Sequence, residues 1–200
     1  MRNAMNNFRP SVAQLQAELI RMDIRQEARR RMQSLICLLA ALAASLSLAI
    51  TLWCPIVQVH GNSMSPTLRD GDILLCVKTA DVIHGDITLF YHNNKILVKR
   101  LIGMGGDWID MDPAGNVIRN GSLLSEDYIA SAAVGTTDIP LPFRVPDGSF
   151  FLLGDHRETS LDSRSSAIGY VPQERILGKA LLRVWPLNRV RFFDTKTPDG

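Results

Sequence analysis

The chain is 200 residues long, with 46% hydrophobic and 21% charged residues and a formal net charge of +2 at pH 7. This length is enough for one modest folded domain with appendages. Seven arginines and only three acidic residues lie in residues 1–33, so the remainder of the chain is net negative. A net-negative main domain offers no basic surface to nucleic acid, which excludes nucleic-acid binding as the main function.

The three cysteines follow no disulfide or metal-binding pattern. Cys37 falls within a long apolar run, Cys54 lies at its outer end, and Cys76 has no obvious partner. There is no Cys-x-x-Cys or His/Cys spacing that would hold a metal ion. We therefore expect small apolar side chains here, and neither a metal nor an organic cofactor.

Residues 1–33 are predicted to form a basic cytoplasmic segment that is helical from about residue 11. Apolar residues recur there every three or four positions between arginines, at Val12, Leu15, Leu19 and Met22. One interpretation is a helix that rests on anionic lipid. The other is a solvated basic segment that only fixes membrane topology, and the sequence leaves both open.

A transmembrane helix is predicted over residues 34–54, which contain no charged residue. A membrane-spanning helix needs about 20 apolar residues. The arginine excess before this run places the N-terminus in the cytoplasm and the rest of the chain outside the cell membrane. The run is longer than a signal-peptide core of about 7–15 residues, and Trp53-Cys54-Pro55 is no small-x-small cleavage site. We therefore expect an uncleaved single-pass anchor.

Residues 55–194 are predicted to form a mostly β domain of antiparallel strands, with a frayed tail at residues 195–200. Short alternating or apolar runs are broken by turn residues, and Asn120-Gly121 is a strong hairpin signal. Residues 130–142 are expected to be an exposed connection. The predicted strands cover residues 56–59, 72–77, 87–91, 96–102, 108–111, 117–119, 150–153 and 181–185.

A candidate nucleophile, Ser63, lies in the segment GNSMSPTL at residues 61–68, soon after the predicted anchor. A serine hydroxyl is a weak nucleophile and needs a base to accept its proton. Gly61 lets the backbone approach a substrate, and Pro66 stiffens the chain after the serine. On its own, the segment is also compatible with an ordinary Ser/Thr-rich turn.

A candidate base, Lys99, lies in the apolar segment LVKRLIG at residues 97–103. Strand alternation directs Lys99 and Arg100 to opposite faces. The pattern alone favours a solvated charge pair on a strand edge. A buried Lys99 would instead have its pKa lowered by desolvation, and its amine would then accept the proton of a hydroxyl.

The third segment, GDHRETSLDSR at residues 154–164, gathers Asp, Arg and Ser side chains in one loop. Such a loop is typical of a structure held by salt bridges and hydrogen bonds. Ser160 is a candidate for orienting a neutral lysine amine, and Asp162 and Arg164 for bracing the loop. A hydrogen-bonded surface turn with no catalytic role is the alternative.

These three segments, in this order after an N-terminal anchor, resemble the bacterial type I signal peptidases, membrane-bound proteases with a Ser–Lys dyad. The resemblance extends over residues 58–184 and includes GDIL at 71–74, VPDG at 145–148 and GYVP at 169–172. It implies a mostly β catalytic domain after one transmembrane helix. It also implies a serine endopeptidase that removes signal peptides from exported preproteins after an Ala-x-Ala-like site, close to the secretion translocon and the lipid bilayer.

The resemblance implies a role for each matching residue. Ser63 would be the nucleophile, with its backbone N–H in the oxyanion hole, and Lys99 the general base. Ser160 would orient Lys99. Asp162 and Arg164 would support the site, and Asp155 and Arg157 would stabilise the loop. The small substrate pockets would be lined by Val57, Gln58, Val59 and Val98.

Two departures from the family pattern stand out. Gly61 occupies a position where some relatives have a serine that assists the oxyanion hole, so backbone donors are expected to replace it. The last loop has His156, Glu158 and Thr159 where Asn, Asp and Asn are usual. Any second β subdomain is expected to be small, because Lys99 and the last segment are close in the sequence.

Several other functions compete with this interpretation. A Ser–His–Asp hydrolase is conceivable because the chain has four histidines, but none lies in a nucleophile-elbow context. A self-cleaving repressor of the same Ser–Lys clan would need a DNA-binding helix pair. A specialised peptidase for a single pilin-like or secretion-system substrate remains open, as does a non-catalytic, membrane-tethered β domain.

Overall fold

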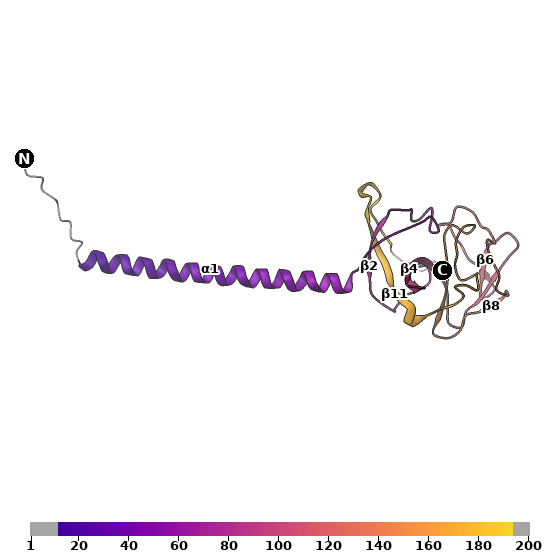
Figure 1. Ribbon diagram of the computed structural model, residues 1–200, viewed down its shortest axis with the longest axis horizontal. Coiled ribbons are helices and arrows are strands. Elements are labelled where there is room, and N and C mark those ends of the chain that lie inside the picture. Colours follow the sequence, from indigo (N-terminus) through magenta and orange to yellow (C-terminus); the bar gives the residue numbers. More distant parts are fainter. Residues whose placement is uncertain (1–11, 194–200) are drawn as a thin grey trace, which may run out of the picture. The chain divides into compact units, whose positions relative to one another are not determined.

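The computed structural model describes residues 12–193 and consists of a long helix followed by a β domain (Figure 1). Residues 1–11 of the predicted N-terminal segment and the predicted tail at 195–200 lie outside the described residues. The chain divides into two compact units, Met1–Thr51 and Leu52–Gly200. The elements are α1 (Val12–Trp53), β1 (Ile56–Gln58), β2 (Ile73–Val77), β3 (Ile87–His92), β4 (Lys95–Met104), β5 (Trp108–Met111), β6 (Val117–Arg119), β7 (Ser122–Leu123), β8 (Phe143–Arg144), β9 (Ser149–Leu153), β10 (Val171–Pro172), β11 (Ile176–Trp185) and β12 (Arg191–Phe192), with 3₁₀ turns η1 (Gln173–Arg175) and η2 (Leu187–Arg189).

Helix α1 runs without a break from Val12, within the predicted basic segment, to Trp53, within the predicted membrane span. It ends at Trp53, because Pro55 disfavours helical geometry at the residue before it. In the described part of the chain it is the one helix long and apolar enough to cross a membrane, with a candidate span of Arg25–Leu48. This span overlaps the predicted residues 34–54. The orientation of the helix remains a prediction.

The large sheet is antiparallel throughout, in the order β1-β2-β11-β3-β4-β9-β10, with β12 paired to β11. Strand β4 lies inside it, hydrogen-bonded to β3 on one side and β9 on the other. A residue in the middle of β4 is therefore shielded from water along both strand edges. This placement matters for Lys99, which lies opposite Thr88 of β3.

The small sheet, in the order β7-β6-β5-β8, is also antiparallel. In Figure 1 its strands β6 and β8 lie on the far side of the domain from β2 and β11. The predicted hairpin at Asn120-Gly121 is confirmed, since both residues have positive φ, 52° and 80°, and join β6 to β7. A cluster of buried apolar residues joins the small sheet to β4 and β9 and includes Ile109 of β5, Ile102 of β4 and Phe151 of β9. The predicted mostly β, antiparallel fold is thus confirmed.

Candidate active site

The candidate nucleophile Ser63 lies in the loop between β1 and β2. The base of the loop is closed by a hydrogen bond from Val59 N to Asp72 O at 2.8 Å. Just after the serine, the side chains of Met64 and Leu68 are 1% and 0% exposed and belong to the core beneath β2. Burying each of them stabilises the loop by about 1.5–3 kcal/mol. The loop is thus fixed, while Ser63 itself stays only partly buried.

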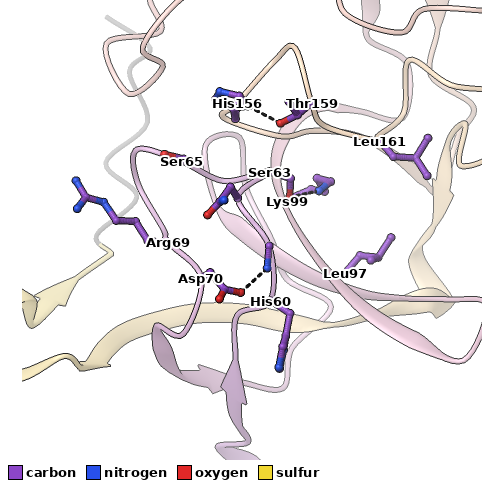
Figure 2. Close-up of a pocket in the computed structure, with 12 residues that line it drawn as sticks. His60, Ser63, Ser65, Arg69, Asp70, Leu97, Lys99, His156, Thr159 and Leu161 are labelled. Atoms are coloured by element: carbon purple, nitrogen blue, oxygen red, sulfur yellow. Dashed lines mark hydrogen bonds between the residues drawn. The ribbon is translucent and has the colours of Figure 1, made fainter.

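The candidate base Lys99 lies directly beside this serine (Figure 2). Lys99 Nζ and Ser63 Oγ are 2.6 Å apart in a hydrogen bond. Lys99 is only 4% exposed and its neighbour Arg100 only 8%. The interpretation of this pair as solvated charges on a strand edge is therefore wrong, because β4 is an interior strand.

Burial lowers the pKa of Lys99 from 10.5 to about 8. Desolvation is the largest cause, since an ammonium loses its hydration shell in this position. Asp162 and Asp155 act in the opposite direction and raise the pKa, whereas Arg164 lowers it. At pH 7 the amine is therefore neutral in about a tenth of molecules, compared with about one in 3,000 for a lysine of ordinary pKa. A neutral amine can accept a proton from a hydroxyl.

Asp162 and Arg164 form a fully buried ion pair beneath the loop at residues 154–164. Arg164 Nε and Nη2 donate to the two carboxylate oxygens of Asp162, each at 2.8 Å. Asp162 Oδ2 also accepts from Gly154 N at 3.0 Å. The loop in turn contacts the nucleophile segment, because His156 N donates to Ser63 O at 3.0 Å. The bracing role predicted for this pair therefore fits its geometry.

Asp155 pairs with Arg100 of β4. Arg100 Nε and Nη2 donate to its two oxygens at 2.9 and 2.6 Å. Arg100 Nη1 donates to Gly85 O at 2.9 Å, and its guanidinium stacks on the Tyr128 ring, 3.9 Å from the centroid. Arg100 therefore locks the last loop to the strand that carries Lys99.

Arg157 has a separate partner, Glu126, to which its Nη2 donates. Both side chains are nearly inaccessible, 0% and 5% exposed. Tyr128 Oη donates to the same carboxylate at 2.6 Å. Burial and the Glu126 charge raise the pKa of Tyr128, so the phenol stays protonated and remains a donor. Sequence reasoning missed Glu126 and Tyr128, which lie in an irregular polar stretch with no pattern that indicates burial.

Ser160 is buried beside Gly154, at 3% exposure. The role predicted for Ser160, orienting Lys99, would need a hydrogen bond between the two side chains, but Ser160 Oγ has no hydrogen-bond partner among residues 12–193. A buried hydroxyl without a partner costs about 1–3 kcal/mol. Its role in orienting Lys99 stays a prediction.

Ser63 and Lys99 lie where two parts of one groove meet, since both parts share these residues with His60 and Leu97. One part, of about 410 Å³, has apolar side chains at more than half of its lining positions and contains all four predicted pocket residues, Val57, Gln58, Val59 and Val98. The other part, of about 880 Å³, is lined mainly by polar residues, with Leu97 and Leu161 as its large apolar side chains. Its further lining residues are Gly61, Asn62, Ser65, Arg69, Asp70, His156, Thr159 and Leu161.

Comparison with known proteins places this arrangement in a family. The family described as signal peptidase, peptidase S26, matches residues 30–185, over three quarters of the chain and all the predicted site residues. The chain belongs to this family. S26 is a family of serine endopeptidases associated with membranes, so the predicted family and enzyme class are confirmed.

Two sequence relatives agree with this assignment. A signal peptidase I of Bacillus licheniformis is 37% identical over 150 residues, which cover 68% of this chain and 79% of the relative. A probable signal peptidase I-2 of Synechocystis is 35% identical over 144 residues, 66% of this chain. The chain covers 63% of that relative's length. A solved signal peptidase I from Enterococcus faecalis is 30% identical, with a TM-score of 0.41 over 50% of this chain and 96% of the other.

Gly61 is the first departure expected from the family pattern, and the structure gives this glycine a conformational role. Its φ is +84°, a left-handed conformation that other residues adopt only with strain. Its N–H donates to Asp70 Oδ1 at 2.7 Å, which is the dashed line drawn from Asp70 in Figure 2. At the second departure, His156 and Thr159 hydrogen-bond to each other at the mouth of the groove. Gly61 and the His156–Thr159 pair thus each make a hydrogen bond that holds their loop in place.

The Ser–His–Asp alternative gains no support from the geometry of this S26 site. His60 and His156 both line the groove, but their recorded side-chain contacts are with Gln58 O and Thr159. His84 pairs with Asp107, whose pKa is lowered by hydrogen bonds despite its partial burial. Within the described range 12–193, no cluster of three His, Cys, Asp or Glu side chains is arranged to hold a metal ion.

Proposed function

We propose that this S26 chain is a type I signal peptidase that uses Ser63 as nucleophile and Lys99 as general base. The observation that carries the proposal is the 2.6 Å contact between Lys99 Nζ and Ser63 Oγ, made by a lysine that is 4% exposed. An exposed lysine would be charged at neutral pH and would have no lone pair to accept a proton. A non-catalytic domain has no need for such a buried amine.

The chemistry proceeds in two stages. Neutral Lys99 accepts the Ser63 proton as Oγ attacks the carbonyl carbon of the scissile peptide bond. The resulting ammonium then donates a proton to the leaving amine, which leaves the signal peptide as an ester on Ser63. In the second stage Lys99 takes a proton from water, which attacks the ester. Lys99 then returns that proton to Ser63 Oγ as the ester bond breaks and the signal peptide is released. The Ser63 N–H, with no hydrogen bond recorded to residues 12–193, is available to the oxyanion.

The apolar part of the groove would bind the residues that precede the cleavage site. The branched apolar side chains of Val57, Val59 and Val98 line this part, and we expect them to favour small apolar residues such as alanine. The polar part would receive the first residues of the mature protein. This division supports cleavage after an Ala-x-Ala-like sequence.

The proposed setting is the outer surface of the cell membrane near the translocon, with the N-terminus of α1 in the cytoplasm. Support comes from the arginine-rich start of the chain and the candidate span in α1. Four apolar residues that lie opposite one another on neighbouring strands of the large sheet give further support. In strand order they are Ile56, Leu75, Leu182 and Phe192. Ile56 and Phe192 are 68% and 73% exposed. Exposed apolar rows of this kind suit contact with lipid.

The test is cleavage of purified preproteins by the full-length chain in lipid vesicles. The wild type should release the signal peptide when alanine precedes the scissile bond and fail when leucine replaces it. Ser63→Ala should leave no detectable product, while Ser122→Ala, at an exposed position on β7, should cleave normally. Cleavage by Ser63→Ala would refute the proposed nucleophile, and a single cleaved substrate in a broad panel would favour the specialised peptidase.

A further inference from the structure

Most of residues 130–142, in the connection between β7 and β8, are exposed as predicted, but this connection also contacts the loop at residues 154–164. We call residues 124–139 the strap. Leu124 and Ile139, at its two ends, pack against the core cluster that joins the sheets. Between these ends, the strap contacts Arg100 of β4 in the large sheet and Arg157 and Arg164 of the loop at residues 154–164.

The strap contacts each of the three arginines behind the site. Glu126 accepts from Arg157, and Tyr128 stacks on Arg100. The carbonyl oxygens of Ala133 and Val134 accept from Arg164 Nη1 at 3.2 and 2.9 Å. Arg157 and Arg164 are only 1% and 0% exposed, and Arg100 is 8% exposed.

A glycine shows how closely the strap approaches the loop. A Cβ added to Gly135 would lie 2.4 Å from Arg157 O and 2.8 Å from Arg164 Nη1. Real Cβ atoms do not come this close to backbone, so any side chain here would push the strap away from the loop. The φ of Gly135, +59°, adds strain for any other residue.

We propose that the strap is a positioning element of the catalytic site. It holds residues 154–164 against β4, which excludes water from the Lys99 amine and keeps Lys99 Nζ directed at Ser63 Oγ. The inference rests on the proposed Ser–Lys chemistry. The strap touches neither Ser63 nor Lys99 in any recorded contact, so it would act through Arg100, Arg157 and Arg164. A displacement of about 1 Å at a catalytic group can lower the rate up to about 100-fold.

The effect of a change in the strap can be measured through the pKa of Lys99, because none of the groups that act on this pKa lies in the strap. Asp155, Asp162 and Arg164 act on its pKa directly, whereas Glu126, Tyr128 and Arg157 are not among its causes. A change in Glu126 or Gly135 therefore alters Lys99 through hydration and geometry rather than through a lost charge. Water admitted to the site would raise the pKa of Lys99, so activity would appear at higher pH than in the wild type.

The experiment compares Gly135→Ala with Gly121→Ala in the full-length chain. Both glycines have positive φ, but a Cβ at Gly121 meets nothing within 4 Å. We expect Gly135→Ala to lower kcat at pH 7 by about 10-fold or more, with KM within about twofold, and to shift the pH profile of kcat/KM upward. Gly121→Ala should keep the wild-type profile.

Two further variants keep the inference testable if Gly135→Ala does not fold. Glu126→Gln should shift the profile upward, and Tyr128→Phe, which keeps the ring on Arg100, should shift it less. Glu174→Gln, at an exposed carboxylate, is their control. Wild-type pH profiles in folded strap variants would show that the strap is structural only and would overturn the inference. Persistent cleavage by Ser63→Ala would instead refute the dyad.

Discussion

Lys99→Met is expected to reduce kcat/KM by about 1,000-fold while leaving the protein folded. Methionine has a similar length and keeps the apolar contacts of β4, but it has no lone pair that can accept the Ser63 proton. The measurement is steady-state cleavage of a preprotein by the full-length chain. Lys78→Met, at an exposed position just after β2, should have wild-type activity.

The same variant should be more stable than the wild type at pH 7, which separates loss of the base from loss of the fold. A pKa of about 8 instead of 10.5 means that the buried ammonium costs about 3 kcal/mol at neutral pH. This cost is fully present below pH 8 and disappears as the pH rises from 8 to 10.5. The gain in free energy of unfolding should therefore shrink over that range. An active or markedly destabilised Lys99→Met protein would contradict the assignment.

Arg164→Met is expected to lower the free energy of unfolding by about 3–5 kcal/mol, because it leaves the buried Asp162 carboxylate without its charge partner. Both side chains of this pair are 0% exposed. The change also removes the hydrogen bonds from Arg164 to the carbonyl oxygens of Val134 and Arg157. Denaturant unfolding at pH 7 measures the loss.

Arg144→Met is the matched control, since Arg144 is exposed on β8. It should change the free energy of unfolding by less than about 0.5 kcal/mol. An equally small change in Arg164→Met would mean that the pair does not brace the loop. In the folded fraction of Arg164→Met, the pKa of Lys99 should rise, because Arg164 lowers it and Asp162 raises it.

The longer strands could be predicted from the sequence, because alternation and turn residues mark them. The predicted strand at 108–111 matches β5, and Asn120-Gly121 turns the chain as expected. The strand predicted at 181–185 is the second half of β11, which begins at Ile176. Two-residue strands such as β7 and β8 were missed, since so short a segment has no periodicity.

The site was only partly predictable for a different reason. Ser63 and Lys99 could be named from their segments, but burial of Lys99 depends on β3 and β9, which flank β4 only in the folded chain. Asp155 was expected to stabilise the loop, yet its Arg100 partner follows from strand pairing. Glu126 gave no local signal, because its burial comes entirely from tertiary contacts.

The central claim is that a buried, neutral Lys99 activates Ser63. The most direct test is the pH dependence of kcat/KM for preprotein cleavage by the wild-type chain, which reports the pKa of the base in the free enzyme. The account predicts activity that rises with pH through a midpoint at about 8, as the Lys99 amine loses its proton. A midpoint near 10.5, or activity independent of pH across this range, would contradict it.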